Sequence, residues 1–168
     1  LTFDAILLGC RFDLIQDDYL YVVGCDQGRG GDVWLLSRPL EPVEGWFSPS
    51  SSWSEPDILS IKSESPQRIS YLSSSADGNG DINVLWAQSP VSDANISSTT
   101  IEFVRWNDKG WANPETIFFS LSGVPVDLLV TADSKERLLF SWVDDSNGDL
   151  LYSWANLEKA NLASEWED

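Results

Sequence analysis

The chain has 168 residues, and a hydrophobic fraction of 42% with nine tryptophans excludes an intrinsically disordered protein. Its 27 acidic and 10 basic residues give a net charge of −17, which repels phosphate groups and argues against nucleic acid and anionic membrane surfaces as partners. No apolar run approaches the roughly 20 residues of a membrane-spanning helix, so we expect no membrane span.

Residues 1–9 resemble the end of a strand that begins elsewhere, because residues 4–8 follow the pattern of residues 115–119. Four short strands separated by polar turns are predicted next, within residues 10–66. They cover residues 11–15, 19–24, 32–38 and 53–58. The loops between them contain Gly, Asn, Asp, Ser and Pro, which provide positive φ or a preset turn geometry.

The two cysteines, Cys10 and Cys25, lie in the first predicted hairpin. A tight turn centred on Asp17 and Asp18 places positions 10 and 25 opposite each other. A disulfide and two buried free thiols are both compatible with this geometry. A disulfide indicates an oxidising compartment, and the glycosylation triplet Asn95-Ile-Ser97 fits the same location, so we expect a secreted or cell-surface protein.

The second and third units, residues 67–123 and 124–168, repeat the four-strand pattern. The predicted strands are 68–73, 82–87, 100–106 and 111–118 in the second unit, and 126–131, 137–143, 149–155 and a fragment at Trp166 in the third. The second strand of each unit is apolar at consecutive positions, so both of its faces must be covered. A helix-like stretch at residues 156–164 occupies a connection and is interpreted as an insertion.

A tryptophan motif recurs with the period of these units. Trp53 is followed by proline and an acid at the third and fourth positions after it, Trp111 is followed by the same pair, and Trp166 begins a third copy, at spacings of 58 and 55 residues. Repeated four-stranded units with two covered faces predict an all-β fold, namely a β-propeller segment of three four-stranded antiparallel blades. A two-sheet sandwich is the alternative.

Three blades do not close a ring, because propellers need about four to eight. We expect the ring to be completed by further blades of a longer chain or by a second copy of this chain, and two copies would give six blades. Residues 1–9 are then the tail of the outer strand of the preceding blade. Residues 10–66, 67–123 and 124–168 are the three blades, and the outer strand of the last one is incomplete.

Several segments resemble the blades of sialidase-like propellers, which are built from bacterial neuraminidase repeats. The resemblance rests on residues 32–38 and 149–154 in the third strand and on Trp53-Ser-Glu-Pro56 in the fourth. The Asp box of that family, Ser-x-Asp-x-Gly-x-Thr-Trp, is present only in a shortened form, Asp108-Lys-Gly110-Trp111. Because this box is structural, the resemblance implies the propeller fold and says little about catalysis.

The same resemblance raises the alternative of a sialidase-like glycoside hydrolase. Such enzymes hold the substrate carboxylate with three arginines, use a tyrosine activated by a glutamate, and use an aspartate as the acid/base. The catalytic candidates are Arg38, Arg105 and Asp133. We favour edge salt bridges for both arginines, because the equivalent residue of the third unit is Trp154. The sequence has no histidine, which excludes histidine-assisted nucleophiles and histidine-ligated zinc within this chain.

Calcium is the only cofactor that the sequence suggests. Asp77, Asn79 and Asp81 place oxygen donors on alternate residues of a short loop, which suits a hard cation. The same pattern is typical of a simple turn, since Asn-Gly is a preferred hairpin sequence. A calcium-stabilised propeller of the adhesion type is therefore a second alternative.

A binding role is the function that we favour from the sequence. Trp46 and Trp106 fall outside the repeated core positions, and an exposed tryptophan can stack on a sugar ring. The acidic turn of Asp17 and Asp18 suits a cation, a sugar or a basic protein. We therefore expect a non-catalytic binding or scaffold domain with a glycan or a protein as its ligand.

Overall fold

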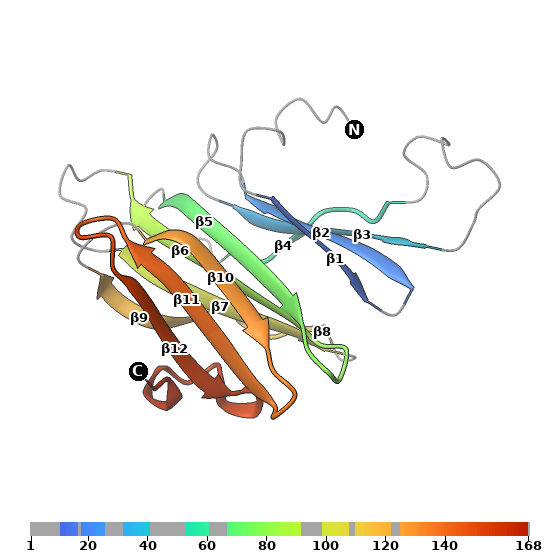
Figure 1. Cartoon of the computed structure of the whole chain (residues 1–168). Helices are drawn as coiled ribbons and strands as arrows, with labels where there is room; N and C mark the ends of the chain where they lie inside the picture. Colours follow the sequence, from blue (N-terminus) through green and yellow to red (C-terminus); the bar gives the residue numbers. More distant parts are fainter. Residues whose placement is uncertain are drawn as a thin grey trace.

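The computed structural model of the chain consists mainly of β-strands (Figure 1). The structure describes residues 11–16, 18–25, 32–40, 53–60, 67–91, 99–107, 110–121 and 125–167. Within this part of the chain the strands form three antiparallel sheets, and two short 3-10 helices lie near the C-terminus. None of the described helices is long and apolar enough to cross a membrane.

The first sheet contains four strands in chain order: β1 (Arg11–Gln16), β2 (Tyr19–Cys25), β3 (Val33–Pro39) and β4 (Asp57–Ile58). Arg11 pairs with Gly24, which is the register that the sequence predicts for a turn at positions 17 and 18. Cys25 takes part in a disulfide. Cys10 lies outside the described residues, so its pairing with Cys25 stays a prediction.

The second sheet contains β5 (Gln67–Ala76), β6 (Ile82–Pro90), β7 (Thr99–Asn107), β8 (Gly110–Trp111) and β9 (Glu115–Leu121). The sequence predicts one fourth strand at residues 111–118, but the structure divides it in two. Both pieces pair with β7. Strand β8 pairs with the C-terminal end of β7, and β9 pairs with its N-terminal half. Pro114 lies in the interruption, where its lack of an N–H costs no ladder hydrogen bond.

The third sheet contains β10 (Pro125–Ala132), β11 (Arg137–Asp144) and β12 (Leu150–Asn156). The predicted fragment at Trp166 is present as a single bridge between Trp154 and Glu167. The helix-like stretch is present as two 3-10 helices, η2 (Leu157–Lys159) and η3 (Ala163–Glu165).

The three sheets follow one another in space, with the second between the first and the third (Figure 1). Their first strands are neighbours, because β5 lies against both β1 and β10. Sheets that meet along their first strands radiate from a common line, as propeller blades do, and do not form the two facing layers of a sandwich. The predicted all-β arrangement is confirmed, and the described sheets do not close a ring.

The central strand β6 is covered on both faces, as the sequence predicts. Val84 and Trp86 pack toward the first sheet, whereas Leu85 and Ala87 pack toward the third. All four are fully buried. This strand therefore contributes to two of the three hydrophobic clusters among the described residues. Fully burying a large apolar side chain contributes about 1.5–3 kcal/mol.

Strand β11 does not follow the same prediction. Phe140 and Trp142 are buried against the second sheet, but Leu139 and Val143, on the other face, are only half-buried. Leu129 and Tyr152 lie beside them on that face and are exposed. The expectation of two covered faces is wrong for this strand, because no other described element packs on the outer face of the third sheet.

Candidate functional site

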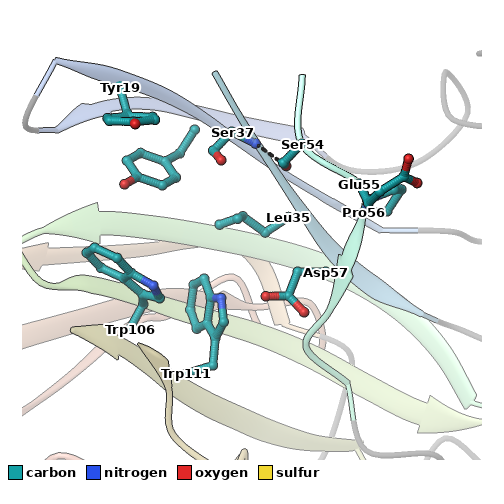
Figure 2. A pocket seen from close by; sticks show the side chains of 10 residues that line it. Tyr19, Leu35, Ser37, Ser54, Glu55, Pro56, Asp57, Trp106 and Trp111 are labelled. Carbon is teal, nitrogen blue, oxygen red and sulfur yellow. Dashed lines mark hydrogen bonds between the residues drawn. The ribbon is translucent and has the colours of Figure 1, made fainter. Parts of the chain in front are cut away.

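A cleft of about 670 Å³ lies between the first and second sheets (Figure 2). Four aromatic residues, two carboxylates, two serines, a leucine and a proline line it: Tyr19, Tyr21, Leu35, Ser37, Ser54, Glu55, Pro56, Asp57, Trp106 and Trp111. Its volume lies in the range of about 300–1,000 Å³ that is typical of small-ligand sites. The aromatic content distinguishes it from an ordinary gap between sheets.

The aromatic wall of the cleft begins on β2 and continues on the second sheet. Tyr19 and Tyr21 lie two residues apart and so share a face of the strand, with ring centroids 6.1 Å apart. Tyr21 contacts Trp106 of β7 at 5.9 Å, and Trp106 pairs with Trp111 of β8. The wall thus extends from the buried Tyr21 to Tyr19, which is 42% exposed.

The opposite wall is the segment that leads into β4. Ser37 donates its backbone N–H to Oγ of Ser54 at 2.9 Å, and Ser54 donates its N–H to the carbonyl of Ser37 at 2.8 Å. These bonds hold the segment against β3, and Asp57 then pairs with Leu35. The carboxylate of Asp57 points into the cleft, whereas that of Glu55 points away from it (Figure 2).

Three polar groups of the cleft are available to a ligand. The indole Nε1 atoms of Trp106 and Trp111 and the carboxylate of Asp57 form no hydrogen bond or ion pair with the described residues. No lysine or arginine is among the described residues that line the cleft. The site therefore offers flat apolar surfaces, hydrogen-bond donors and one anionic acceptor at the same place.

Arg105 is an ion-pair partner, as expected, and it lies outside this cleft. Its Nη2 contacts Oδ2 of Asp77 at 2.9 Å and Oδ2 of Asp81 at 2.7 Å, and its Nη1 donates to the carbonyl of Leu157 at 2.9 Å. The guanidinium thus connects the second sheet to the segment after the third. It borders a second cleft of about 390 Å³, and the described residues that line this cleft include no other arginine.

The loop predicted to bind calcium is organised by Asp77. Its Oδ1 accepts the N–H groups of Asn79 and Asp81, and its Oδ2 accepts from Nδ2 of Asn83 at 3.2 Å and from Arg105. The guanidinium thus faces the two carboxylates that a cation would need. Among the described residues no group of three acidic or cysteine side chains is placed to hold a metal ion. Calcium at this loop stays untested.

Asp133 has the same structural role in the third sheet. Its Oδ1 accepts the N–H groups of Lys135 and Arg137, and its Oδ2 accepts from Nε and Nη2 of Arg137 at 2.8 and 2.6 Å. The hydrogen bond from the Arg137 side chain is the main reason that the pKa of Asp133 is lowered from 3.8. Asp133 and Asp77 both cap the turn between the first and second strands of their sheets.

The remaining predicted site residues that the structure describes, Arg38 and Asp18, are not brought together. The Cζ atom of Arg38 lies 5.4 Å from the ring centroid of Trp53. Arg38 is on β3 of the first sheet, whereas Arg105 is on β7 of the second. Asp18 is an exposed turn residue with φ of +61°, and its carbonyl accepts the N–H of Leu40 at 2.6 Å. Asp17 and Trp46 lie outside the described residues. Of the two predicted ligand-binding residues that the structure describes, Trp106 lines the aromatic cleft and Asp18 does not.

No protein-family model and no curated protein matches this sequence. Solved structures match its fold. The Hadza microbial sialidase Hz136 is 11% identical with a TM-score of 0.63, and the match covers 93% of this chain and 36% of that one. The polysaccharide lyase PL25, an ulvan lyase, is 10% identical with a TM-score of 0.62, covering 94% and 42%.

The endo-arabinase from Bacteroides thetaiotaomicron VPI-5482 is 13% identical with a TM-score of 0.56, covering 93% of this chain and 58% of that one. These neighbours have β-propeller-like folds. The chain has a propeller-like fold. It spans between 36% and 58% of the length of these three neighbours. At such identities the likeness shows the fold alone, and it does not single out sialidase repeats.

Sequence reasoning missed most of the cleft. Trp111 was expected in a buried repeat position, but it is half-buried and lines the cleft. The spacing of Tyr19 and Tyr21 signals a shared aromatic face on a strand, yet nothing in the sequence shows that Trp106 of the next sheet extends it. The inward direction of Asp57 likewise depends on how β4 lies against β3.

Proposed function

We propose that this chain is a carbohydrate-binding part of a β-propeller and that it acts by binding rather than by catalysis. The observation that carries the proposal is the aromatic cleft between the first and second sheets. A sugar ring has a flat face of C–H groups and a rim of hydroxyls. The rings of Tyr19, Trp106 and Trp111 suit that face, because aromatic surfaces bury apolar area while their edges remain able to bond polar groups.

The polar groups of the cleft match the rim of such a ligand. Nε1 of Trp106 and Nε1 of Trp111 donate, and the carboxylate of Asp57 accepts strong hydrogen bonds from hydroxyls. The cleft is open to solvent at Tyr19, which suits an extended oligosaccharide better than a deeply enclosed monosaccharide. We expect dissociation constants in the micromolar to millimolar range, since association costs offset much of the apolar burial.

The arrangement of the carboxylates supports a non-catalytic role. Glycoside hydrolysis uses two carboxyl groups that face each other across the scissile bond, about 5–10 Å apart. In the cleft Asp57 points inward and Glu55 points outward (Figure 2). Asp133 is occupied by Arg137, and Arg38 and Arg105 have separate partners. A sialidase-like hydrolase remains the alternative if further sheets supply the missing groups.

The outer face of the third sheet supports a larger assembly. Exposed Leu129, Leu150 and Tyr152 lie where a further sheet would pack, and large apolar surfaces of this kind mark interaction sites. We propose that further blades, from a longer chain or a second copy of this one, complete the ring. The disulfide at Cys25 supports a secreted or cell-surface location.

The test is a binding titration with oligosaccharides and two matched tyrosine variants. We expect Tyr19→Ala to weaken binding about tenfold, equivalent to ~1.4 kcal/mol, because it removes the exposed end of the aromatic wall. Tyr152→Ala, which removes a 65% exposed tyrosine from the third sheet, should leave the affinity unchanged. Isothermal titration calorimetry measures both. Equal effects of the two variants, or no binding to any oligosaccharide in the panel, would refute the proposal.

A further inference from the structure

The aromatic cleft has a charge that bears on which sugars it accepts. Asp57 places its carboxylate inside the cleft and forms no ion pair with the described residues. Glu55 adds a second negative charge at the rim. No described lining residue is positively charged, so the described lining carries a net negative charge, and the net charge of −17 over the whole chain has the same sign.

The two arginines that are adjacent in sequence to cleft residues, Arg38 and Arg105, have other partners. Arg38 stacks on Trp53, and Arg105 is bound to Asp77 and Asp81. A site that recognises a carboxylate or a sulfate ordinarily uses an arginine in bidentate geometry. The described residues of the cleft provide no such group, and an anionic sugar would bring its charge close to Asp57.

We infer that the cleft selects uncharged oligosaccharides and disfavours glycans that carry sialic acid, uronic acid or sulfate; this inference rests on the proposed carbohydrate binding. Hydroxyl groups donate hydrogen bonds to the Asp57 carboxylate, whereas a sugar carboxylate at the same place would be repelled by it. The aromatic wall then provides affinity for many sugars, and Asp57 provides discrimination between neutral and acidic ones.

The experiment compares matched neutral and acidic probes. Xylohexaose is titrated against its glucuronic acid-substituted form, and lactose against 3′-sialyllactose, in low and in high salt. Where a pair of probes binds, we expect the neutral probe to bind at least tenfold more tightly than the acidic probe at low salt. The difference in affinity should be smaller at high salt, because salt screens the repulsion. Asp57→Asn should narrow the gap at low salt, and Glu55→Gln, whose side chain points away, should change it much less.

The outcomes separate the two proposals. An acidic probe that binds as tightly as its neutral counterpart, or more tightly, overturns the selectivity and leaves carbohydrate binding intact. Binding of neither probe to the wild-type chain overturns the proposed function and this inference together. Asp57→Asn preserves the size of the side chain at an exposed position, so we expect it to fold, and far-UV circular dichroism checks this. The salt comparison tests the inference on the wild-type chain without any variant.

Discussion

Strands β6 and β11 are second strands of equivalent sheets, yet their surroundings differ. Val84 and Trp86 correspond to Phe140 and Trp142, and in both sheets these residues face the preceding sheet and are buried. The opposite face of β6 is covered by the third sheet, whereas that of β11 is partly open. The comparison teaches that the burial of a repeated strand depends on its neighbours and not on its own pattern alone.

The largest expected effect tests this difference directly. Leu85→Ala should cost about 3–5 kcal/mol of unfolding free energy, because it leaves a cavity at a fully buried position. Leu139→Ala, on the equivalent open face of β11, should cost less than about 1 kcal/mol. Urea denaturation measures both. A large effect at Leu139 would mean that the outer face of the third sheet is covered in solution, and its dependence on protein concentration would then identify self-assembly.

The two turn-capping carboxylates sharpen the same comparison. Arg105→Ala should cost about 2–3 kcal/mol, because it leaves the Asp77 carboxylate, whose side chain is 0% exposed, without its cation. Arg137→Ala removes the partner of the more exposed Asp133 and should cost clearly less than Arg105→Ala. Thermal unfolding at equal protein concentration compares the variants. Similar losses would contradict the view that burial distinguishes the two ion pairs.

A smaller effect is expected from pH at the third sheet. A lowered pKa of Asp133 means that its ionised form stabilises the fold above the ordinary value of 3.8, and that this contribution is lost as the pH falls through the lower folded-state value. Asp133→Asn should therefore be less stable than the wild type at neutral pH, and the difference should shrink below pH 3.8. Asp145→Asn, in the next turn of the same sheet, is the control. A constant difference across this range would count against the ionised carboxylate as the cause.

The smallest effect is expected from calcium. Because Arg105 faces Asp77 and Asp81, we expect the midpoint of thermal unfolding to change by less than about 1 °C between millimolar calcium and a chelator. A clear stabilisation by calcium, lost in Asp81→Asn, would instead support the calcium-stabilised alternative.

The strands themselves were predictable because their signal is local. The alternation of apolar segments with turn residues located all three sheets to within a few residues, and the turn at positions 17 and 18 predicted the pairing of Arg11 with Gly24. The division of the fourth strand of the second sheet was missed, although Pro114 in its middle was a visible signal. The loop at Asp77 was left open between a simple turn and a calcium site, because a turn-capping carboxylate and a metal ligand share one sequence pattern. The turn-capping role of Asp133, a catalytic candidate from the sequence, was missed.

The sequence by itself determined that this protein is a series of repeated antiparallel sheets, since strand periodicity, turn chemistry and the tryptophan repeat are all properties of nearby residues. Only the tertiary structure decided which aromatic residues form a site. Tyr19 and Trp111 are separated by most of two units, and they line one cleft because the first and second sheets are neighbours in the fold. The direction of Asp57, the engagement of Arg105 and the open face of β11 also arise from contacts between sheets, which no local pattern encodes.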